Sequence, residues 1–322
     1  MKAVQVGAFG GVEVLRVVER PQPEPGAGEL LIRVAACGLN YSDVMQREGL
    51  YPGGPKPPFF PGVEAAGVVE SVGANVDGQP PPGSRVACIT GGGAHAEYVV
   101  AEAGSCVPLP DGVSFKEGAA FPVQYLTAFH ALSTVARAGA GETVLVHAAG
   151  GGVGTAAVQV ARLLGLRVLG TASTPEKRDR VLGLGAFGAF DYEGFEAAAR
   201  EFTGGRGPDI ILDTVGGEVL RRSLALLPPL GRLVVLGLAS REAPAIDTVK
   251  LLFRSQAVLG FHLSAVLGRR GLTQSSVRQL LSWISEGALK VQVGHTLPLA
   301  EIRRAHELLA GRRSYGKVVL LP

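Results

Sequence analysis

The sequence predicts an α/β protein in which an irregular β-barrel is followed by a doubly wound parallel sheet. The first third of the chain contains short β-type runs, such as Leu30–Val34, Gly67–Val72 and Ala96–Val100, separated by turn-forming clusters. After Phe121 the pattern changes to short, wholly apolar strands that alternate with amphipathic helices. Strands of this kind, joined by helices, indicate a parallel sheet that is covered on both faces.

The region after Phe121 carries the elements of this sheet in order. The apolar runs expected to form its strands are Thr143–His147, Val168–Thr171, Ile210–Asp213, Leu233–Leu238 and Val258–Phe261. Amphipathic spacing between these runs predicts helices over Thr155–Leu164, Glu176–Leu184 and Val219–Leu226.

The C-terminal tail holds two helical stretches and a closing strand, at Val277–Ser285, Leu299–Leu309 and Lys317–Leu321. The tail has no Gly-rich turn of its own, so it need not form a third domain. We expect it to rejoin the N-terminal region. Residues 1–121 and 264–322 would then form one discontinuous domain, and residues 122–263 the other.

The composition excludes several classes of protein. Apolar residues make up 47% of the 322 residues and charged residues 18%, a balance typical of a globular enzyme. The formal charge is only +3 and the basic residues are scattered, so we expect no nucleic-acid-binding groove. No apolar run approaches the roughly 18–20 residues that span a bilayer, and the N-terminus does not resemble a signal peptide. A cytoplasmic protein without membrane contact is therefore expected.

The cysteines Cys37, Cys88 and Cys106 show no C-x-x-C pairing. This spacing favours neither a disulfide framework nor a structural zinc. We interpret the three residues as reduced thiols, most of them buried.

The most specific local pattern is a Gly-rich turn between a strand and a helix. The strand that begins at Val144 runs into this turn, whose cofactor-binding positions are expected to be Gly151, Gly152, Val153 and Gly154. Glycines permit close backbone approach to a pyrophosphate, and the amide groups and positive end of the next helix attract its charge. The strand before the turn and the helix after it favour a dinucleotide site over a purely structural turn.

The end of the second strand of this sheet favours NADP over NAD. An NAD site usually has Asp or Glu there, whereas this strand ends in Gly170-Thr-Ala-Ser173. Ser173 offers a hydroxyl, and Lys177 and Arg178 follow one turn into the next helix. The alternative is that both cations are ordinary solvated residues of that helix.

Five segments together carry a specific resemblance to one family. They are Ala36–Asp43, Gly49–Pro52, Pro61–Gly67, Ala119–Ala128 and His147–Gly154. Over its whole length the chain resembles the zinc-free quinone oxidoreductase (zeta-crystallin-like) branch of the medium-chain dehydrogenase/reductase superfamily. The resemblance implies a GroES-like β-barrel catalytic domain and a Rossmann domain, with the active site in the cleft between them.

The resemblance also implies a site without metal. Zinc-dependent alcohol dehydrogenases of this superfamily have Cys at the position of Asn40 and His at that of Val63, and their third ligand Cys would fall near Val123–Gln124. A catalytic zinc needs about three protein ligands, which Glu64 alone cannot supply. Cys37 neighbours the lost ligand position, and we interpret it as a buried barrel thiol. Hydride addition to an electrophilic acceptor does not need such a Lewis acid.

The same resemblance implies that NADPH is the cofactor and that the following residues surround it. Asn40 and Thr127 are expected by the nicotinamide ribose and ring, Ser173, Lys177 and Tyr192 by the 2′-phosphate, and Gly237, Phe261 and Leu263 along the nicotinamide half. Lys317 stands where some relatives place a second phosphate-binding cation. Tyr192 and Phe261 could each instead be simple core aromatics.

The implied reaction is hydride transfer from NADPH to a small quinone or α,β-unsaturated carbonyl. Tyr51 matches a tyrosine that related 2-enoyl thioester reductases use near the substrate carbonyl. Tyr51 and Asn40 are therefore the candidate catalytic residues, with Tyr51 as proton donor or oxygen polariser. The alternative for Tyr51 is a packing role in a Pro-rich loop. Asp43 is expected to cap a turn rather than to act as an acid.

Two other functions stay open. A 2-enoyl thioester reductase shares the fold and cofactor and differs only in its acyl pocket. A non-catalytic RNA-binding or crystallin-like structural protein is the alternative from another class, although the intact Gly-rich turn and low net charge argue against a purely nucleic-acid role. The apolar run Ala257–Leu263 predicts pairing of two edge strands, and hence a homodimer.

Overall fold

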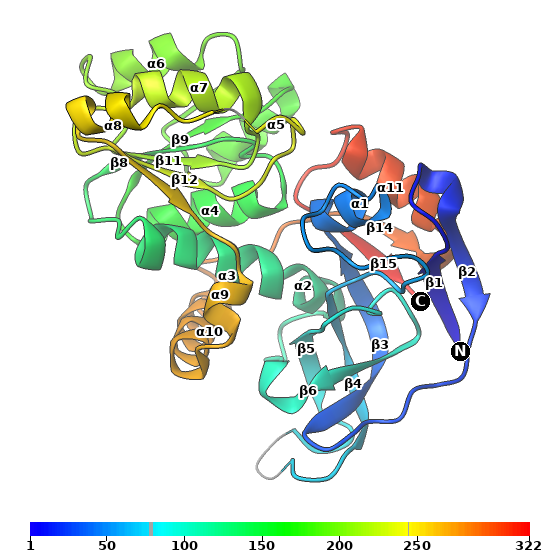
Figure 1. Ribbon diagram of the computed structural model, residues 1–322. Helices are drawn as coiled ribbons and strands as arrows, with labels where there is room; N and C mark the ends of the chain where they lie inside the picture. Colours follow the sequence, from blue (N-terminus) through cyan, green and yellow to red (C-terminus); the bar gives the residue numbers. More distant parts are fainter. Residues whose placement is uncertain (77–79, 244) are drawn as a thin grey trace. The chain divides into compact units, whose positions relative to one another are not determined.

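The computed structural model describes residues 1–76, 80–243 and 245–322. Over these residues the chain divides into two units (Figure 1). Met1–Val123 and Lys290–Pro322 form the first unit, and Gln124–Leu289 forms the second. The first unit is discontinuous, since its strands come from both ends of the chain.

The second unit ends at Leu289, whereas the sequence predicted that it ends at residue 263. Residues 264–289 therefore belong to the second unit. His130 Nε2 lies 3.0 Å from the Ser276 hydroxyl, and the rings of Phe129 and Trp283 lie 6.1 Å apart. The Arg162 guanidinium donates to the Ala288 carbonyl at 2.9 Å. These contacts hold residues 276–288 against the rest of the second unit, so the chain returns to the first unit only after Leu289.

The first unit is built around a sheet with the order β14-β15-β3-β4-β5-β7, in which β6 also pairs with β3. All of these pairs are antiparallel except β14 with β15. A separate antiparallel pair joins β1 and β2. The strands are β1 (Lys2–Val6), β2 (Leu15–Glu19), β3 (Glu29–Leu39), β4 (Glu64–Val72), β5 (Arg85–Ile89), β6 (Tyr98–Glu102), β7 (Cys106–Pro108), β14 (Val293–Pro298) and β15 (Lys317–Leu321).

The helices of this unit are α1 (Tyr41–Arg47), α2 (Phe115–Ala120) and α11 (Ile302–Ala310), within the described ranges. Helix α2 begins with a capping box, in which the Ser114 hydroxyl accepts from the Glu117 amide and the Glu117 carboxylate accepts from the Ser114 amide. The core of this unit is formed largely by strand residues, such as Leu30, Ile32 and Val86.

The second unit contains a parallel sheet with the order β10-β9-β8-β11-β12-β13, as the alternating pattern predicts. Its strands are β8 (Thr143–Val146), β9 (Arg167–Thr171), β10 (Gly188–Phe190), β11 (Ile210–Asp213), β12 (Arg232–Val235) and β13 (Ala257–Gly260). Counted from β8, this is the 3-2-1-4-5-6 order of a doubly wound sheet. The order reverses between β8 and β11, where such sheets bind ligands outside the carboxyl ends of their strands.

The helices of the second unit lie on both faces of the sheet, with α4 on one face and α6 and α7 on the other (Figure 1). They are α3 (Pro122–His130), α4 (Gly152–Leu163), α5 (Pro175–Gly183), α6 (Phe195–Phe202), α7 (Gly217–Leu226), α8 (Thr248–Arg254), α9 (Ser264–Leu267) and α10 (Arg270–Ser285). Strands β8 and β11 are buried throughout, which explains why all of their residues except Thr143 and Asp213 are apolar. Among the described residues, no helix combines the length and apolar character needed to span a bilayer.

Candidate functional site

The Gly-rich turn leaves β8 and enters α4 in the second unit. Helix α4 begins at Gly152, after Gly151 in an extended conformation, and no described side chain caps it. A Cβ on Gly154 would lie 2.2 Å from the Ala148 carbonyl oxygen, so only glycine fits at this close approach. Because the first amides of a helix have no acceptor inside it, those of Gly152, Val153 and Gly154 could donate to an anion.

A buried histidine and a tyrosine hold the start of this turn. His147 Nδ1 lies 3.0 Å from the Thr171 hydroxyl and Nε2 lies 2.8 Å from the Ser223 hydroxyl. Burial, aided by the nearby Arg222 charge, lowers the pKa of His147 to about 3, so the ring stays neutral. The Tyr192 ring stacks on His147, and its hydroxyl accepts from the Ala148 amide at 3.1 Å. Tyr192 therefore lies beside the turn.

Lys177 is brought to the same turn by α5. The Thr174 hydroxyl caps this helix by accepting from the Lys177 amide, and Pro175 stands at its first position. A Cβ on Gly150 would lie 3.3–3.5 Å from three carbons of the Lys177 side chain, so the lysine stem packs over the turn. Partial burial lowers the pKa of Lys177.

Ser173 and Arg178, the neighbours of Lys177 in the predicted 2′-phosphate site, differ in their exposure and contacts. Ser173 lies two residues after the end of β9 and is exposed, and the segment between β9 and α5 carries no acid. The Arg178 guanidinium donates to the Ala172 carbonyl at 3.3 Å, which gives it a structural role at this helix end. Lys177 and Tyr192 thus both lie beside the turn, and Ser173 lies between β9 and α5.

The other residues expected along the cofactor lie at the carboxyl edge of the same sheet or next to it. Gly237 follows β12 and Phe261 follows β13, and the Phe261 amide donates to the Val235 carbonyl at 3.0 Å. Leu263 precedes α9, and Thr127 lies on α3. Phe261, Leu263 and Thr127 are all half-buried. The edge that carries the Gly-rich turn therefore also carries Gly237 and Phe261.

Gln124 is a polar residue at this turn that the sequence did not single out as a cofactor neighbour. It is buried on α3, and a Cβ on Gly152 would lie 1.8 Å from its side-chain nitrogen. In the sequence analysis, Gln124 enters only because zinc-dependent relatives have their third ligand Cys near this position. A buried amide among apolar residues of a matching segment is the signal that could have identified it.

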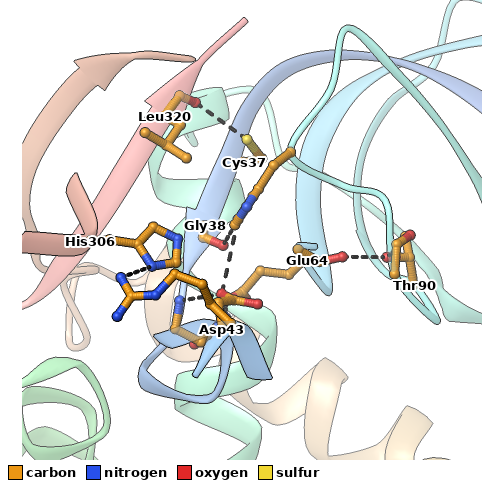
Figure 2. Close-up of polar contacts among 12 residues, drawn as sticks. Cys37, Gly38, Asp43, Glu64, Thr90, His306 and Leu320 are labelled. Carbon is orange, nitrogen blue, oxygen red and sulfur yellow. Dashed lines mark hydrogen bonds and ion pairs between the residues drawn. The ribbon is translucent and has the colours of Figure 1, made fainter. Parts of the chain in front are cut away.

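The first unit gathers a second set of polar side chains, which includes Asp43, Glu64 and His306 (Figure 2). The Asn40 side-chain amide donates to Glu64 Oε1 at 2.8 Å, and its oxygen accepts from Lys317 Nζ at 2.7 Å. Lys317 also forms an ion pair with Glu64, and both are fully buried. The backbone amide of Val123 donates to Glu64 Oε2 at 3.0 Å.

Lys317, expected to contact a cofactor phosphate, instead contacts two side chains of its own unit. A cation that binds a cofactor phosphate must present its ammonium group at a surface, whereas Lys317 Nζ is buried and bonded to Asn40 and Glu64. The sequence resemblance identified the position but not the partners of its side chain.

Asp43 holds the backbone at Asn40, as predicted. Its carboxylate accepts from the Asn40 amide at 2.7 Å and lies 3.9 Å from His95 Nε2, which in turn lies 3.2 Å from the Gly38 carbonyl oxygen. Burial raises the pKa of Asp43, although the neighbouring His95 opposes this shift. Cys37 is buried in the same region, as predicted, and burial raises the pKa of its thiol.

Tyr51 lies in the loop after α1 and is half-buried. Burial raises the pKa of its phenol, and the negative charge of Asp43 raises it further. The phenol is therefore protonated at neutral pH and able to donate a hydrogen bond or a proton. Asn40, Asp43 and Tyr51 thus belong to one polar region of the first unit.

Comparison with known proteins gives the same two-part division. Residues 26–111 match the family model described as the alcohol dehydrogenase GroES-like domain, and residues 152–286 match the one described as zinc-binding dehydrogenase. The chain is 37% identical to the quinone oxidoreductase of Homo sapiens, with 100% of this chain and 98% of that protein covered.

Solved structures agree. The Escherichia coli quinone oxidoreductase complexed with NADPH matches this chain with a TM-score of 0.94 and a sequence identity of 31%. The Thermus thermophilus quinone oxidoreductase, also solved with NADPH, matches with a TM-score of 0.89 and a sequence identity of 41%. Both matches cover 100% of each chain. The predicted fold class, a GroES-like domain with a Rossmann-type sheet, is confirmed. The chain belongs to the quinone oxidoreductase branch of the medium-chain dehydrogenase/reductase superfamily.

Proposed function

We propose that this chain is a zinc-independent, NADPH-dependent reductase that transfers hydride to quinones or α,β-unsaturated carbonyls. The observation that carries the proposal is the uncapped Gly-rich terminus of α4 with the Lys177 stem packed over it. Two relatives that match over their full length, from Escherichia coli and Thermus thermophilus, were solved with NADPH. When bound, NADPH supplies the hydride from C4 of its nicotinamide ring.

The residues of the second unit fit a phosphorylated dinucleotide. The amides of Gly152, Val153 and Gly154 suit the pyrophosphate, because glycine at position 154 lets the backbone approach closely. Lys177, Ser173 and Tyr192 would hold the 2′-phosphate with charge-assisted hydrogen bonds. We assign Gly237, Phe261, Leu263 and Thr127 to the nicotinamide half, together with Asn40.

The proposed zinc independence is supported by what fills the space around Asn40. The Lys317 ammonium contacts both Asn40 Oδ1 and Glu64 Oε1, the two oxygens that a divalent ion would need there. A cation bound between them would meet a buried positive charge.

We therefore expect the purified protein to contain no stoichiometric zinc and to keep its reductase activity after chelation. Elemental analysis and turnover before and after treatment with a chelator check this prediction. Stoichiometric zinc, with activity that is lost to the chelator and restored by zinc alone, would contradict the proposal.

The residues of the first unit supply the acid chemistry. Hydride addition leaves an enolate or a hydroquinone anion, which takes up a proton. Tyr51 is the proposed donor, because its phenol is protonated at neutral pH and only half-buried.

An acceptor panel tests the proposed function against its nearest alternative. Quinones, enones and 2-enoyl thioesters are offered with NADPH, and the rate of NADPH oxidation is measured for each. The proposal predicts that 1,2-naphthoquinone or a simple enone is reduced with a higher kcat/KM than a crotonyl thioester. A preference for the thioester would assign the chain to the 2-enoyl thioester reductases instead.

We further propose that the protein works in the cytoplasm as a homodimer joined through β13. This strand lies at the edge of the sheet, and α8 before it exposes Val249, Leu252 and Phe253, which are 60%, 72% and 83% exposed. Pairing of two β13 strands would cover this apolar surface and satisfy both edges.

Replacing Phe253 with Glu should convert the dimer to a monomer. Phe187→Glu, at the opposite edge beside β10, serves as the control and should leave the dimer intact. Sedimentation velocity measures both variants. A monomeric wild type, or dissociation caused by Phe187→Glu and not by Phe253→Glu, would rule out the β13 interface.

A further inference from the structure

Three adjacent strands of the first unit bring a buried ion pair to Asn40. Strand β15 pairs with β3 through Val318 and Leu39, and β3 pairs with β4 through Cys37 and Ala65. These registers place Lys317, Asn40 and Glu64 at one end of three neighbouring strands. Lys317 and Glu64 are separated by 253 positions in the chain, so the fold alone creates the pair.

The pair determines which way the Asn40 amide faces. An ammonium group can only donate hydrogen bonds, and a carboxylate can only accept them. The amide oxygen must therefore face Lys317 and the amide nitrogen must face Glu64. A flipped amide would place its NH2 group against the ammonium and its oxygen against the carboxylate, so both charge-assisted bonds would be lost.

Lys317 and Glu64 do not use all of the hydrogen-bonding groups of the Asn40 side-chain amide. Asn40 is 9% exposed, whereas Lys317 and Glu64 are 0% exposed. One hydrogen of the Asn40 NH2 group is donated to Glu64, and the second hydrogen is left for another acceptor. The backbone of Asn40 is held separately, through its amide bond to Asp43.

A glycine next to the ion pair leaves room for both of its side chains. A Cβ on Gly38 would lie 2.6 Å from Lys317 Cε and 2.9 Å from Glu64 Cγ, so the glycine makes room for both side chains. A buried ion pair adds little net stability, since apolar residues of similar volume do as well or better. Its presence beside an amide that keeps 9% exposure points to a role in positioning that amide.

We propose that Lys317 and Glu64 are positioning residues that hold the Asn40 amide in one orientation toward the nicotinamide half of NADPH. This inference rests on the proposed function, which assigns Asn40 to that half of the cofactor. It replaces the direct phosphate contact expected of Lys317 by an indirect role through Asn40.

The chain offers a direct probe of the orientation, because Asn40 and Asn75 are its only asparagines. Asparagine-selective ¹⁵N labelling therefore yields two side-chain amide groups, of which the exposed Asn75 is the internal reference. In the wild type, the Asn40 side-chain hydrogens should exchange with solvent at least about 10-fold more slowly than those of Asn75. Equally fast exchange in the wild type would overturn the proposal without any variant.

The variant Lys317→Met/Glu64→Gln removes both charges at similar volume, because a single change would leave one buried charge unpaired. After thermal unfolding has established that it folds, the Asn40 protection should be lost and Asn75 should not change. Its affinity for NADPH should fall about 3–10-fold, as expected when an amide samples competing orientations. Adenosine 2′,5′-bisphosphate lacks the nicotinamide half, so its affinity should stay the same. Lys116→Met, an exposed lysine of α2, should change neither affinity.

A double-mutant cycle separates positioning from a general structural effect. In an Asn40→Ala background, the Lys317→Met/Glu64→Gln change should weaken NADPH binding by less than about 2-fold, since it acts through the missing amide. An equal loss in both backgrounds, or an equal loss of NADPH and adenosine 2′,5′-bisphosphate, would overturn the positioning role alone. A wild type that does not bind NADPH would overturn the proposed function as well.

Discussion

Tyr51→Phe is expected to lower kcat for an enone by about 10²–10⁴-fold, the usual contribution of a positioned proton donor. The reason is that the phenol is half-buried in the first unit and stays protonated under the influence of burial and Asp43. Phenylalanine keeps the ring and removes only the hydroxyl, so the loop should pack as before. The affinity for NADPH should therefore be unchanged.

The pH dependence of kcat provides a second readout for this residue. Since the pKa of Tyr51 is raised above its ordinary value of about 10, the donor form persists through neutral and mildly alkaline pH. The kcat for the enone should fall only above that value, and this alkaline limb should vanish in Tyr51→Phe.

Steady-state kinetics with the enone, alongside titration of NADPH binding, measures the effect. Tyr98→Phe, on β6 of the same unit, is the matched control and should retain its kcat. An unchanged kcat for Tyr51→Phe would return Tyr51 to a packing role in its loop. A quinone is a weaker test, because its reduced anion is aromatic and needs a proton donor less.

Lys177→Ala is expected to reduce kcat/KM for NADPH by about 10–100-fold, which corresponds to loss of one charge-assisted hydrogen bond. Lys177 packs over Gly150 in the Gly-rich turn, and the segment between β9 and α5 has no acid to repel a 2′-phosphate. The loss should appear in KM with kcat little changed, because the contact is equal in the ground and transition states. NADH lacks the 2′-phosphate and should be used as before.

Both cofactors are compared at fixed ionic strength, because added salt screens the same contact. Lys250→Ala, an exposed lysine on α8, controls for the general loss of positive charge. Equal use of NADH and NADPH by the unmodified protein would refute the phosphate site at Lys177. An equal loss with both cofactors would make Lys177 a structural residue of the turn.

The second unit could be predicted well because its signals are local. Short strands made almost entirely of apolar residues, such as Ile210–Asp213, need burial on both faces, and the Gly-rich turn lies between one strand and one helix in sequence. Lys177 likewise lies beside the turn because the helix begins at a sequence-visible cap, Thr174 followed by Pro175.

The remaining features depend on contacts between distant parts of the chain. The sequence identified Asn40 and Lys317 separately but could not show that Glu64 joins them, since a buried cation has no local signature. Helix α10 has an amphipathic pattern that does not reveal which core it covers, so the predicted boundary before residue 264 does not coincide with the division after Leu289. The short helix α1 was missed within a β-rich region, although Asn40 and Asp43 have the spacing of a helix cap.

The central claim is that hydride passes from C4 of NADPH to an electrophilic acceptor. It is tested most directly with NADPH that carries deuterium at both C4 positions and with the best enone of the acceptor panel. Mass spectrometry and NMR of the product locate the label. The account predicts that NADPH is consumed one-for-one with the enone and that each product molecule carries one deuterium at its β-carbon. Consumption of NADPH that leaves the product unlabelled, or no consumption with any acceptor of the panel, would contradict it.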